Sequence, residues 1–197
     1  MKFDVSFFKK MGMFKKITGF FSIIILPFTT IIVIPLIILV FTYNKFSWHL
    51  NYPLILLPII FGSLLILSGI YLLVITNKLF HAIGKDTLAP WHPPKLLVTI
   101  GPYKYIRNPM IGAVLLILLG EALITGSVIL FSWFVIFFII NIIYFVYSEE
   151  PALVKRFGNN YKKYKETVPM FIPKFIVKKP RSFLYKNNLN SRHLNEK

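Results

Sequence analysis

The sequence contains no cysteine and very few acidic residues, only seven Asp and Glu against 23 Lys and Arg in 197 residues. The lack of cysteine excludes disulfide frameworks, thiolate metal sites and cysteine nucleophiles. Charged residues make up 15% of the chain, whereas soluble domains average about a quarter. With 56% hydrophobic residues, too few polar side chains remain to cover a soluble globule. The net charge of +16 therefore indicates an anionic membrane surface as the partner rather than nucleic acid.

Common catalytic and ligand-binding motifs are missing as well. The sequence has no G-x-G-x-x-G, no P-loop, no G-x-S-x-G and no H-E-x-x-H pattern. Its four histidines show no spacing of three or four residues, so no metal site is predicted.

Long hydrophobic runs dominate what is present. Ile17–Asn44 and Phe46–Asn77 carry no charge, and each exceeds the roughly 20 helical residues that span a bilayer. The first run is also longer than the core of a signal peptide, so we interpret it as a retained span. Asn108–Ser148 contains one charge, Glu121, and is long enough for two helices with a break at Thr125-Gly126-Ser127. The predicted spans are about 19–43, 53–76, 109–124 and 127–148, the third being short.

The distribution of Lys and Arg predicts the orientation of these spans. Residues 1–16 hold five, 44–52 one, 78–107 five, 124–127 none and 149–197 twelve. Because basic residues concentrate on the cytoplasmic side, both termini and the 78–107 segment are predicted to be cytoplasmic. We therefore expect an all-α protein of the cytoplasmic (inner) membrane with four antiparallel transmembrane helices.

The region after the last span has a different pattern. Leu153, Phe157, Tyr161 and Tyr164 recur at helical spacing, with basic residues on the opposite face. This predicts an amphipathic helix at the cytoplasmic interface, with its basic face toward anionic lipid headgroups. The expected organisation is an interfacial helix at about 150–165, one membrane domain over 1–177, and a basic tail at 178–197.

Polar residues that could carry chemistry lie at two cytoplasmic helix ends. In the first, Asn108 is predicted to cap a helix that begins at Pro109, with Arg107 beside it. A helix N-terminus with a neighbouring Arg is suited to anion binding, although a capped membrane helix with a snorkelling Arg has the same pattern. The second is Glu149-Glu150, either a functional pair or a solvated end of the span.

Antiparallel helices would bring these two places together in one interfacial pocket. A pocket with an anion site, aromatic rings and carboxylates suits S-adenosylmethionine, which carries a carboxylate, an ammonium and a sulfonium group. Glu121 lies four residues before the outer turn, so we interpret it as a wet, structural position.

Two long motifs point to a family. The first is Gly101-Pro102-Tyr103-Lys104-Tyr105-Ile106-Arg107-Asn108-Pro109, and the second is Glu149-Glu150-Pro151-Ala152-Leu153 followed by Phe157-Gly158, Tyr161, Tyr164, Val168-Pro169 and Pro173. Their order and separation resemble the isoprenylcysteine carboxyl methyltransferase and phospholipid methyltransferase superfamily of membrane enzymes. Many members have His-Pro where this chain has Asn108-Pro109, so a histidine-based proton transfer is not expected here.

The resemblance implies S-adenosylmethionine as methyl donor, without a metal. It implies cofactor binding by Lys95, Leu96, Leu97, Val98, Tyr103, Asn108, Pro109, Met110, Ile111 and Glu150. Arg107 would accompany a carboxylate acceptor, whereas Glu149 or Glu150 would take a proton from an amine acceptor. We expect Glu150 to face the positive groups of the cofactor and Glu149 the acceptor, or the reverse. The membrane setting predicts a lipophilic acceptor that enters from the bilayer.

Two other functional classes are compatible with an apolar, basic chain. An NADPH-dependent reductase of the sterol-reductase type would need more converging basic residues and more spans. A non-enzymatic transporter or anchor is the second alternative. A transport path would require a series of polar residues along the spans, and the predicted spans do not contain one.

Overall fold

All regular elements in the described part of the chain are helical. The structure, a computed structural model, describes residues 27–42, 48, 50–84 and 96–172, and no strand occurs among them. In chain order the elements are the π-helical turn η1 (Thr29–Val33), α2 (Ile34–Thr42), α3 (Leu56–Gly84), the 3-10 turn η2 (Gly101–Lys104), α4 (Pro109–Thr125), α5 (Val128–Tyr144), the π-helical turn η3 (Phe145–Glu149), α6 (Glu150–Phe157) and α7 (Asn159–Thr167).

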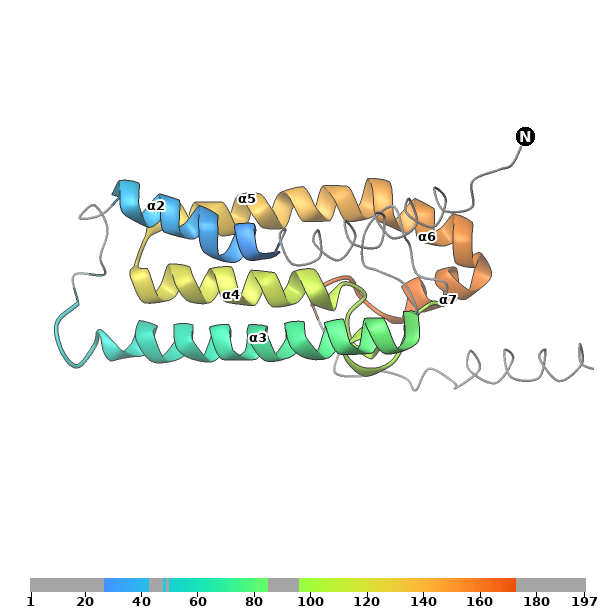
Figure 1. Ribbon diagram of the computed structural model, residues 1–197, viewed down its shortest axis with the longest axis horizontal. Helices are drawn as coiled ribbons and strands as arrows, with labels where there is room; N and C mark the ends of the chain where they lie inside the picture. Colours follow the sequence, from blue (N-terminus) through green and yellow to red (C-terminus); the bar gives the residue numbers. More distant parts are fainter. Residues whose placement is uncertain (1–26, 43–47, 49, 85–95, 173–197) are drawn as a thin grey trace, which may run out of the picture.

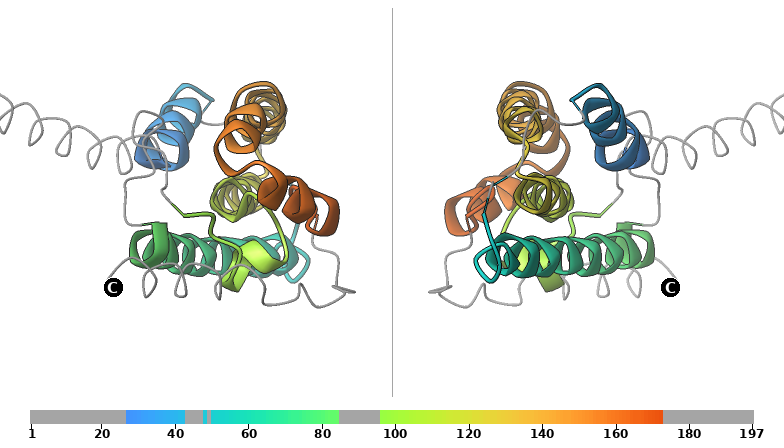
Figure 2. Two further views of the ribbon diagram at one scale, coloured as in Figure 1. Left: turned by 90° about the vertical axis from the view of Figure 1, so that its right-hand side faces the viewer. Right: turned by 90° about the vertical axis from the view of Figure 1, so that its left-hand side faces the viewer.

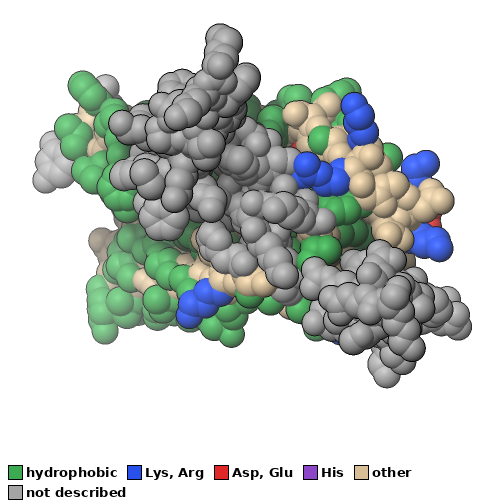
Figure 3. Space-filling view, turned by 45° about the vertical axis from the view of Figure 1, so that its right-hand side comes forward, with side chains coloured by type: hydrophobic (Ala, Val, Ile, Leu, Met, Phe, Trp, Pro, Cys, Tyr) green, Lys and Arg blue, Asp and Glu red, His purple; other side chains and the backbone are tan. Residues whose placement is uncertain are grey.

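The longer helices lie lengthwise beside one another, and successive ones run in opposite directions (Figure 1). Seen end-on in Figure 2, α4 lies in the middle, with α3 on one side and α2 and α5 on the other. Helix α6 continues from α5, and α7 folds back at the end of the bundle where α3 ends and α4 begins. Most of the Lys and Arg side chains visible in Figure 3 lie at this end, over α6 and α7.

Within the described part of the chain, two helices are long and apolar enough to cross a membrane, Leu56–Leu79 and Val128–Phe157. Only 17% and 11% of their most apolar stretches are buried inside the protein, so their side chains face outward as they would toward lipid. Thr29–Thr42 and Pro109–Thr125 are shorter apolar helices. The first predicted span is described only from residue 27 onward, and the predicted tail at 178–197 lies outside the described residues.

Helices α3 and α4 approach each other closely through small residues. A Cβ atom added to Gly69 would lie 2.8 Å from the carbonyl oxygen of Ala113, and one added to Gly62 would lie 2.7 Å from that of Gly120. A Cβ added to Gly120 would in turn lie 2.6 Å from the carbonyl oxygen of Gly62. Small residues let helix backbones touch, which is how apolar helices associate where lipid is the solvent.

The predicted break in the third apolar run is confirmed. Helix α4 ends at Gly126, whose φ of 64° is left-handed, and α5 is capped by Ser127, whose Oγ accepts a hydrogen bond from the Leu130 amide at 3.3 Å. From the segment between α2 and α3, Trp48 Nε1 donates a hydrogen bond to the Leu123 carbonyl at 2.6 Å. Local capping chemistry therefore sets this turn, as the sequence indicates.

The helix that contains the second predicted span is longer than the span itself. Helix α3 continues beyond residue 76 to Gly84, so Lys78 belongs to the helix rather than to the following loop. The prediction placed the end at the first charge. A long Lys side chain can reach water from within a helix, so the charge marks the edge of the apolar segment and not the end of the helix.

The predicted interfacial helix is two helices rather than one. Gly158, with φ 55° and ψ −131°, separates α6 from α7, a conformation that favours glycine. Because α7 folds back, Tyr161 and Tyr164 form a packed cluster with Val168, against which Leu153, Val154, Phe157 and Leu97 also pack. The helical spacing correctly marked a shared apolar surface, but that surface is folded on itself.

Candidate active site

The segment before α4 is held by a buried tyrosine. The turn η2 begins at Gly101, which has a φ of 60°, and Tyr103 packs with Val98 and Leu79. Burial raises the pKa of the Tyr103 phenol, and the nearby negative charge of Glu149 raises it further. Tyr103 is therefore a neutral ring that lies within electrostatic reach of Glu149.

The start of α4 matches the predicted cap. Asn108 Oδ1 accepts a hydrogen bond from the Ile111 amide at 3.3 Å, and Pro109 is the first helical residue. The Gly112 amide donates to the Asn108 carbonyl at 3.1 Å. Pro109 has no N–H, so the Met110 amide is the donor that this first turn leaves without a partner among the described residues.

An ion pair joins the two sequence motifs. Arg107 Nη1 donates to Glu150 Oε1, and Lys165 Nζ lies 2.5 Å from Glu150 Oε2. The side chains of Arg107 and Glu150 are 9% and 6% exposed, whereas that of Lys165 is 48% exposed. Both oxygens of Glu150 thus have basic partners, one buried and one at the surface.

Aromatic rings surround the Arg107 guanidinium. Its Cζ lies 5.6 Å from the centroid of the Phe145 ring, and Tyr161 Oη lies 3.4 Å from Nη1. Arg107 Nε is buried and has no hydrogen-bond partner among the described residues. The contacts of Nη1 and the Phe145 ring therefore fix the orientation of the guanidinium, while its Nε–H lacks an acceptor in this part of the chain.

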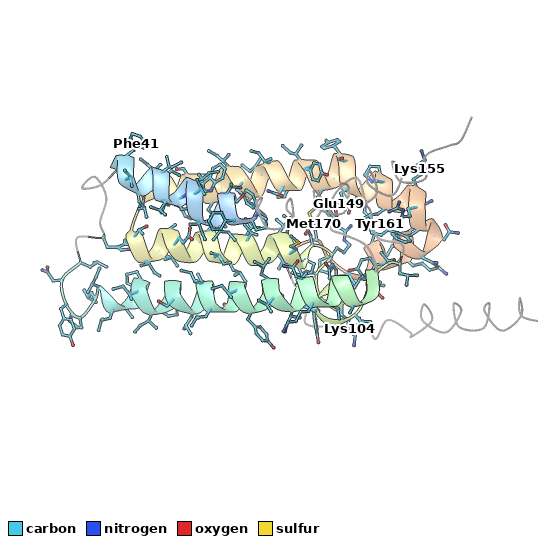
Figure 4. All side chains as sticks on the ribbon, in the orientation of Figure 1. Phe41, Lys104, Glu149, Lys155, Tyr161 and Met170 are labelled. Atoms are coloured by element: carbon cyan, nitrogen blue, oxygen red, sulfur yellow. The ribbon has the colours of Figure 1, made fainter. Side chains whose placement is uncertain are left out.

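The chain after α7 runs along the start of α4. Tyr164 Oη donates to the Tyr103 carbonyl at 2.6 Å. The Arg107 amide donates to the Pro169 carbonyl at 2.8 Å, and the Asn108 amide donates to that of Met170 at 3.2 Å. In Figure 4, Glu149, Tyr161 and Met170 lie together between α5 and α3, whereas Lys104 and Lys155 lie on the outside. The predicted meeting of the two motifs is confirmed.

The two adjacent glutamates differ in environment. Glu150 is 4% exposed and paired, whereas Glu149 is half-buried, and no basic side chain in the described ranges pairs with it. Its negative charge also acts on Tyr161. Arg107 and Lys165 each bind one oxygen of Glu150, so Glu149 is the carboxylate of the two that lacks a basic partner among the described residues; which of them faces a cofactor stays a prediction.

A comparison with protein families agrees with these motifs. The sequence profile described as phospholipid methyltransferase matches residues 54–160, more than half of the chain and inclusive of the Arg107–Glu150 pair. The chain belongs to the phospholipid methyltransferase family. It is therefore a membrane methyltransferase, in agreement with its outward-facing apolar helices. A search of curated proteins finds no match to the sequence.

The segment before η2 contains the other residues predicted to bind a cofactor in this phospholipid methyltransferase family member, and their surroundings differ. Leu97 packs against the cluster of Tyr161, Tyr164 and Val168, and Val98 packs against Tyr103. Leu96 is 37% exposed, and Lys95 lies outside the described residues. The side chains of Leu97 and Val98 therefore take part in packing within the protein.

Sequence reasoning missed two residues that complete the site of this methyltransferase. Lys165 binds Glu150 from fifteen residues away, and Phe145 lies under Arg107. Phe145 and Glu150 are separated by one π-helical turn, η3, so α-helical spacing does not predict that they share a face. For Lys165 the sequence carries no local signal, because the fold-back at Gly158 creates the contact.

Proposed function

We propose that the protein transfers a methyl group from S-adenosylmethionine to an amine or carboxylate of a lipophilic acceptor in the membrane, with an amine favoured. The observation that supports this most strongly is the buried Arg107–Glu150 pair. It joins the two family motifs at the capped start of α4, and it leaves Glu149 without a basic partner in the part of the chain that the structure describes.

The donors and acceptors of the site suit this cofactor. Its carboxylate would be held at the N-terminus of α4, by the Met110 amide and Arg107 Nε. Its positive groups would face Glu149 and the rings of Tyr103 and Tyr161. When bound, S-adenosylmethionine supplies a methyl group on a positively charged sulfur.

Glu150 acts through Arg107 and is a positioning residue. It neutralises and orients the guanidinium, and the Nε donor of Arg107 would be taken by the carboxylate of the cofactor, so we do not assign Arg107 to the carboxylate of an acceptor. Glu149 would instead attract a protonated amine and accept its proton. The nitrogen lone pair would then form the new N–C bond as the S–C bond breaks, which requires alignment at about 3–3.5 Å rather than a further catalyst.

The same proposal includes the placement of the protein in the membrane. The helices would form four spans over a domain of residues 1–177 in the cytoplasmic membrane, with both termini cytoplasmic. The basic surfaces of α6 and α7 would contact anionic headgroups. Reporter fusions at Asn188 and Trp48 test this, since they should report opposite sides. A report of the same side from both would refute the four-span arrangement.

Cofactor binding is tested by calorimetry of the detergent-solubilised protein with S-adenosylhomocysteine and with NADPH. We expect binding of the first and none of the second. Binding of NADPH alone would favour a reductase, and binding of neither would favour a non-enzymatic protein.

The role of Glu149 is tested by methyl-transfer assays with amine-bearing and carboxylate-bearing lipids. Glu149→Gln should lower the rate about 30-fold or more, which corresponds to about 2 kcal/mol, without lowering thermal stability. Glu166→Gln, an exposed change on α7, is the matched control and should leave the rate unchanged. A wild-type rate in Glu149→Gln would refute the assignment.

A further inference from the structure

A groove lies at the opposite end of α4 from the candidate active site. It has a volume of about 300 Å³ and is lined by apolar side chains of η1, α2, α3 and α4, together with Glu121 and Thr125. Glu121 comes twelve residues after Pro109. At 1.5 Å per residue it lies about 18 Å along the helix from the start of α4. The groove is therefore separate from the site built around Arg107.

Glu121 is the unusual residue in this groove. Its Oε2 is buried without a hydrogen-bond partner, and within the described ranges no basic side chain pairs with it. Thr125 Oγ1 donates to the backbone carbonyl of Glu121 at 2.7 Å, and not to its carboxylate. Protein atoms therefore enclose this oxygen, whereas the interpretation of Glu121 as a wet, structural position stays a prediction. An acid among apolar helices without a partner is costly, which marks it as a candidate binding group.

We propose that this groove binds a bilayer amphiphile whose head group carries a primary ammonium. A carboxylate oxygen needs a donor, and an ammonium supplies three N–H donors with the complementary charge. The apolar walls from η1, α2 and α4 require that the rest of the ligand be hydrocarbon, which selects a lipid over a soluble amine. The proposal requires the helices to lie in a membrane but does not depend on the methyl-transfer assignment.

The test uses native mass spectrometry of the full-length protein in a non-ionic detergent, with dodecylamine as the probe. Dodecanol has the same chain without the charge, and ethanolamine has the amine without the chain. Dodecylamine should bind about tenfold more tightly than dodecanol, a difference in binding free energy similar to that of one polar contact inside a membrane. Ethanolamine should not bind. Equal binding of dodecylamine and dodecanol, or equally tight binding of ethanolamine, would overturn the proposal.

Two variants locate the binding site. Glu121→Gln keeps the size of the side chain and should lower the affinity for dodecylamine about tenfold while leaving that for dodecanol unchanged. Ile32→Trp narrows the groove from η1 and leaves Glu121 in place, so it should weaken the binding of both dodecylamine and dodecanol. Thermal unfolding in the same detergent checks that each variant is folded. If either folded variant binds dodecylamine as tightly as wild type does, the proposal is overturned. One folded variant is enough for this test if the other fails to fold.

Discussion

The two main junctions of the bundle are built from different chemistry. The α3–α4 seam contains Gly62, Gly69 and Gly120 in backbone contact, and no side-chain hydrogen bond crosses it in the described part of the chain. The junction of the α4 start with α6 and α7 instead contains a buried ion pair, a tyrosine–carbonyl hydrogen bond and two backbone hydrogen bonds.

This difference follows from the solvent that each junction meets. Within lipid the hydrophobic effect does not drive helices together, so close packing of small residues must do so. At the basic end, charged groups can be paired and oriented. Such a pair contributes little net stability over an apolar replacement, although removal of one partner is costly. The seam therefore holds the scaffold together, and the polar junction determines the geometry of the site.

The largest expected effect is from breaking the polar junction. Arg107→Ala leaves Glu150 buried with only Lys165 as a partner and should lower the free energy of unfolding by about 3–5 kcal/mol. The loss is measured by denaturant unfolding in detergent. Arg107→Ala/Glu150→Ala should recover part of it, because no buried charge is then left unpaired. A double variant no more stable than the single one would contradict this account.

Breaking the seam should have a smaller effect. Gly69→Ala places a Cβ atom 2.8 Å from the Ala113 carbonyl, and overpacking of this kind costs about 1–3 kcal/mol. Gly112→Ala is the matched control, since its added Cβ meets only the end of the flexible Ile106 side chain, at 3.3 Å. The two variants are compared in the same thermal unfolding assay. Equal loss in both would show that the close approach of α3 and α4 is not what holds the seam.

The helix cap at the border of the site should matter less again. Asn108→Ala removes the acceptor of the Ile111 amide and should weaken binding of S-adenosylhomocysteine by about 1 kcal/mol, roughly fivefold. Asn108→Ser retains a capping oxygen and should bind nearly as well as wild type. Calorimetry measures both, and weaker binding to the Ser variant than to the Ala variant would exclude a capping role.

The smallest effect is expected at the exposed edge of the polar junction. Lys165→Gln removes the outer partner of Glu150, but this side chain is 48% exposed, so the loss of stability should stay below about 1 kcal/mol. Added salt should reduce the difference from wild type. Lys162→Gln on the same helix, outside the pair, is the control. A loss as large as that of Arg107→Ala would mean that the outer contact, and not the buried one, holds α7.

Local interactions made much of the fold predictable. Caps at Asn108 and Ser127 and the left-handed Gly126 lie within a few residues of the helix ends that they determine. Charge-free stretches indicated where apolar helices lie, but not where α3 ends. Each end of the site was predictable from its own short motif, and their meeting was predictable from the antiparallel arrangement of the helices.

What the sequence by itself determined is the helical, membrane-directed character of the chain and the capped start of α4, since these depend on residues a few positions apart. Only the tertiary structure decided which glutamate is paired. Arg107 meets Glu150 across 43 residues, and that contact depends on how α4 packs beside α5 and on the π-helical turn before Glu150. Adjacent residues on a helix point about 100° apart, so one residue of difference in the turn decides which carboxylate is buried and which remains available.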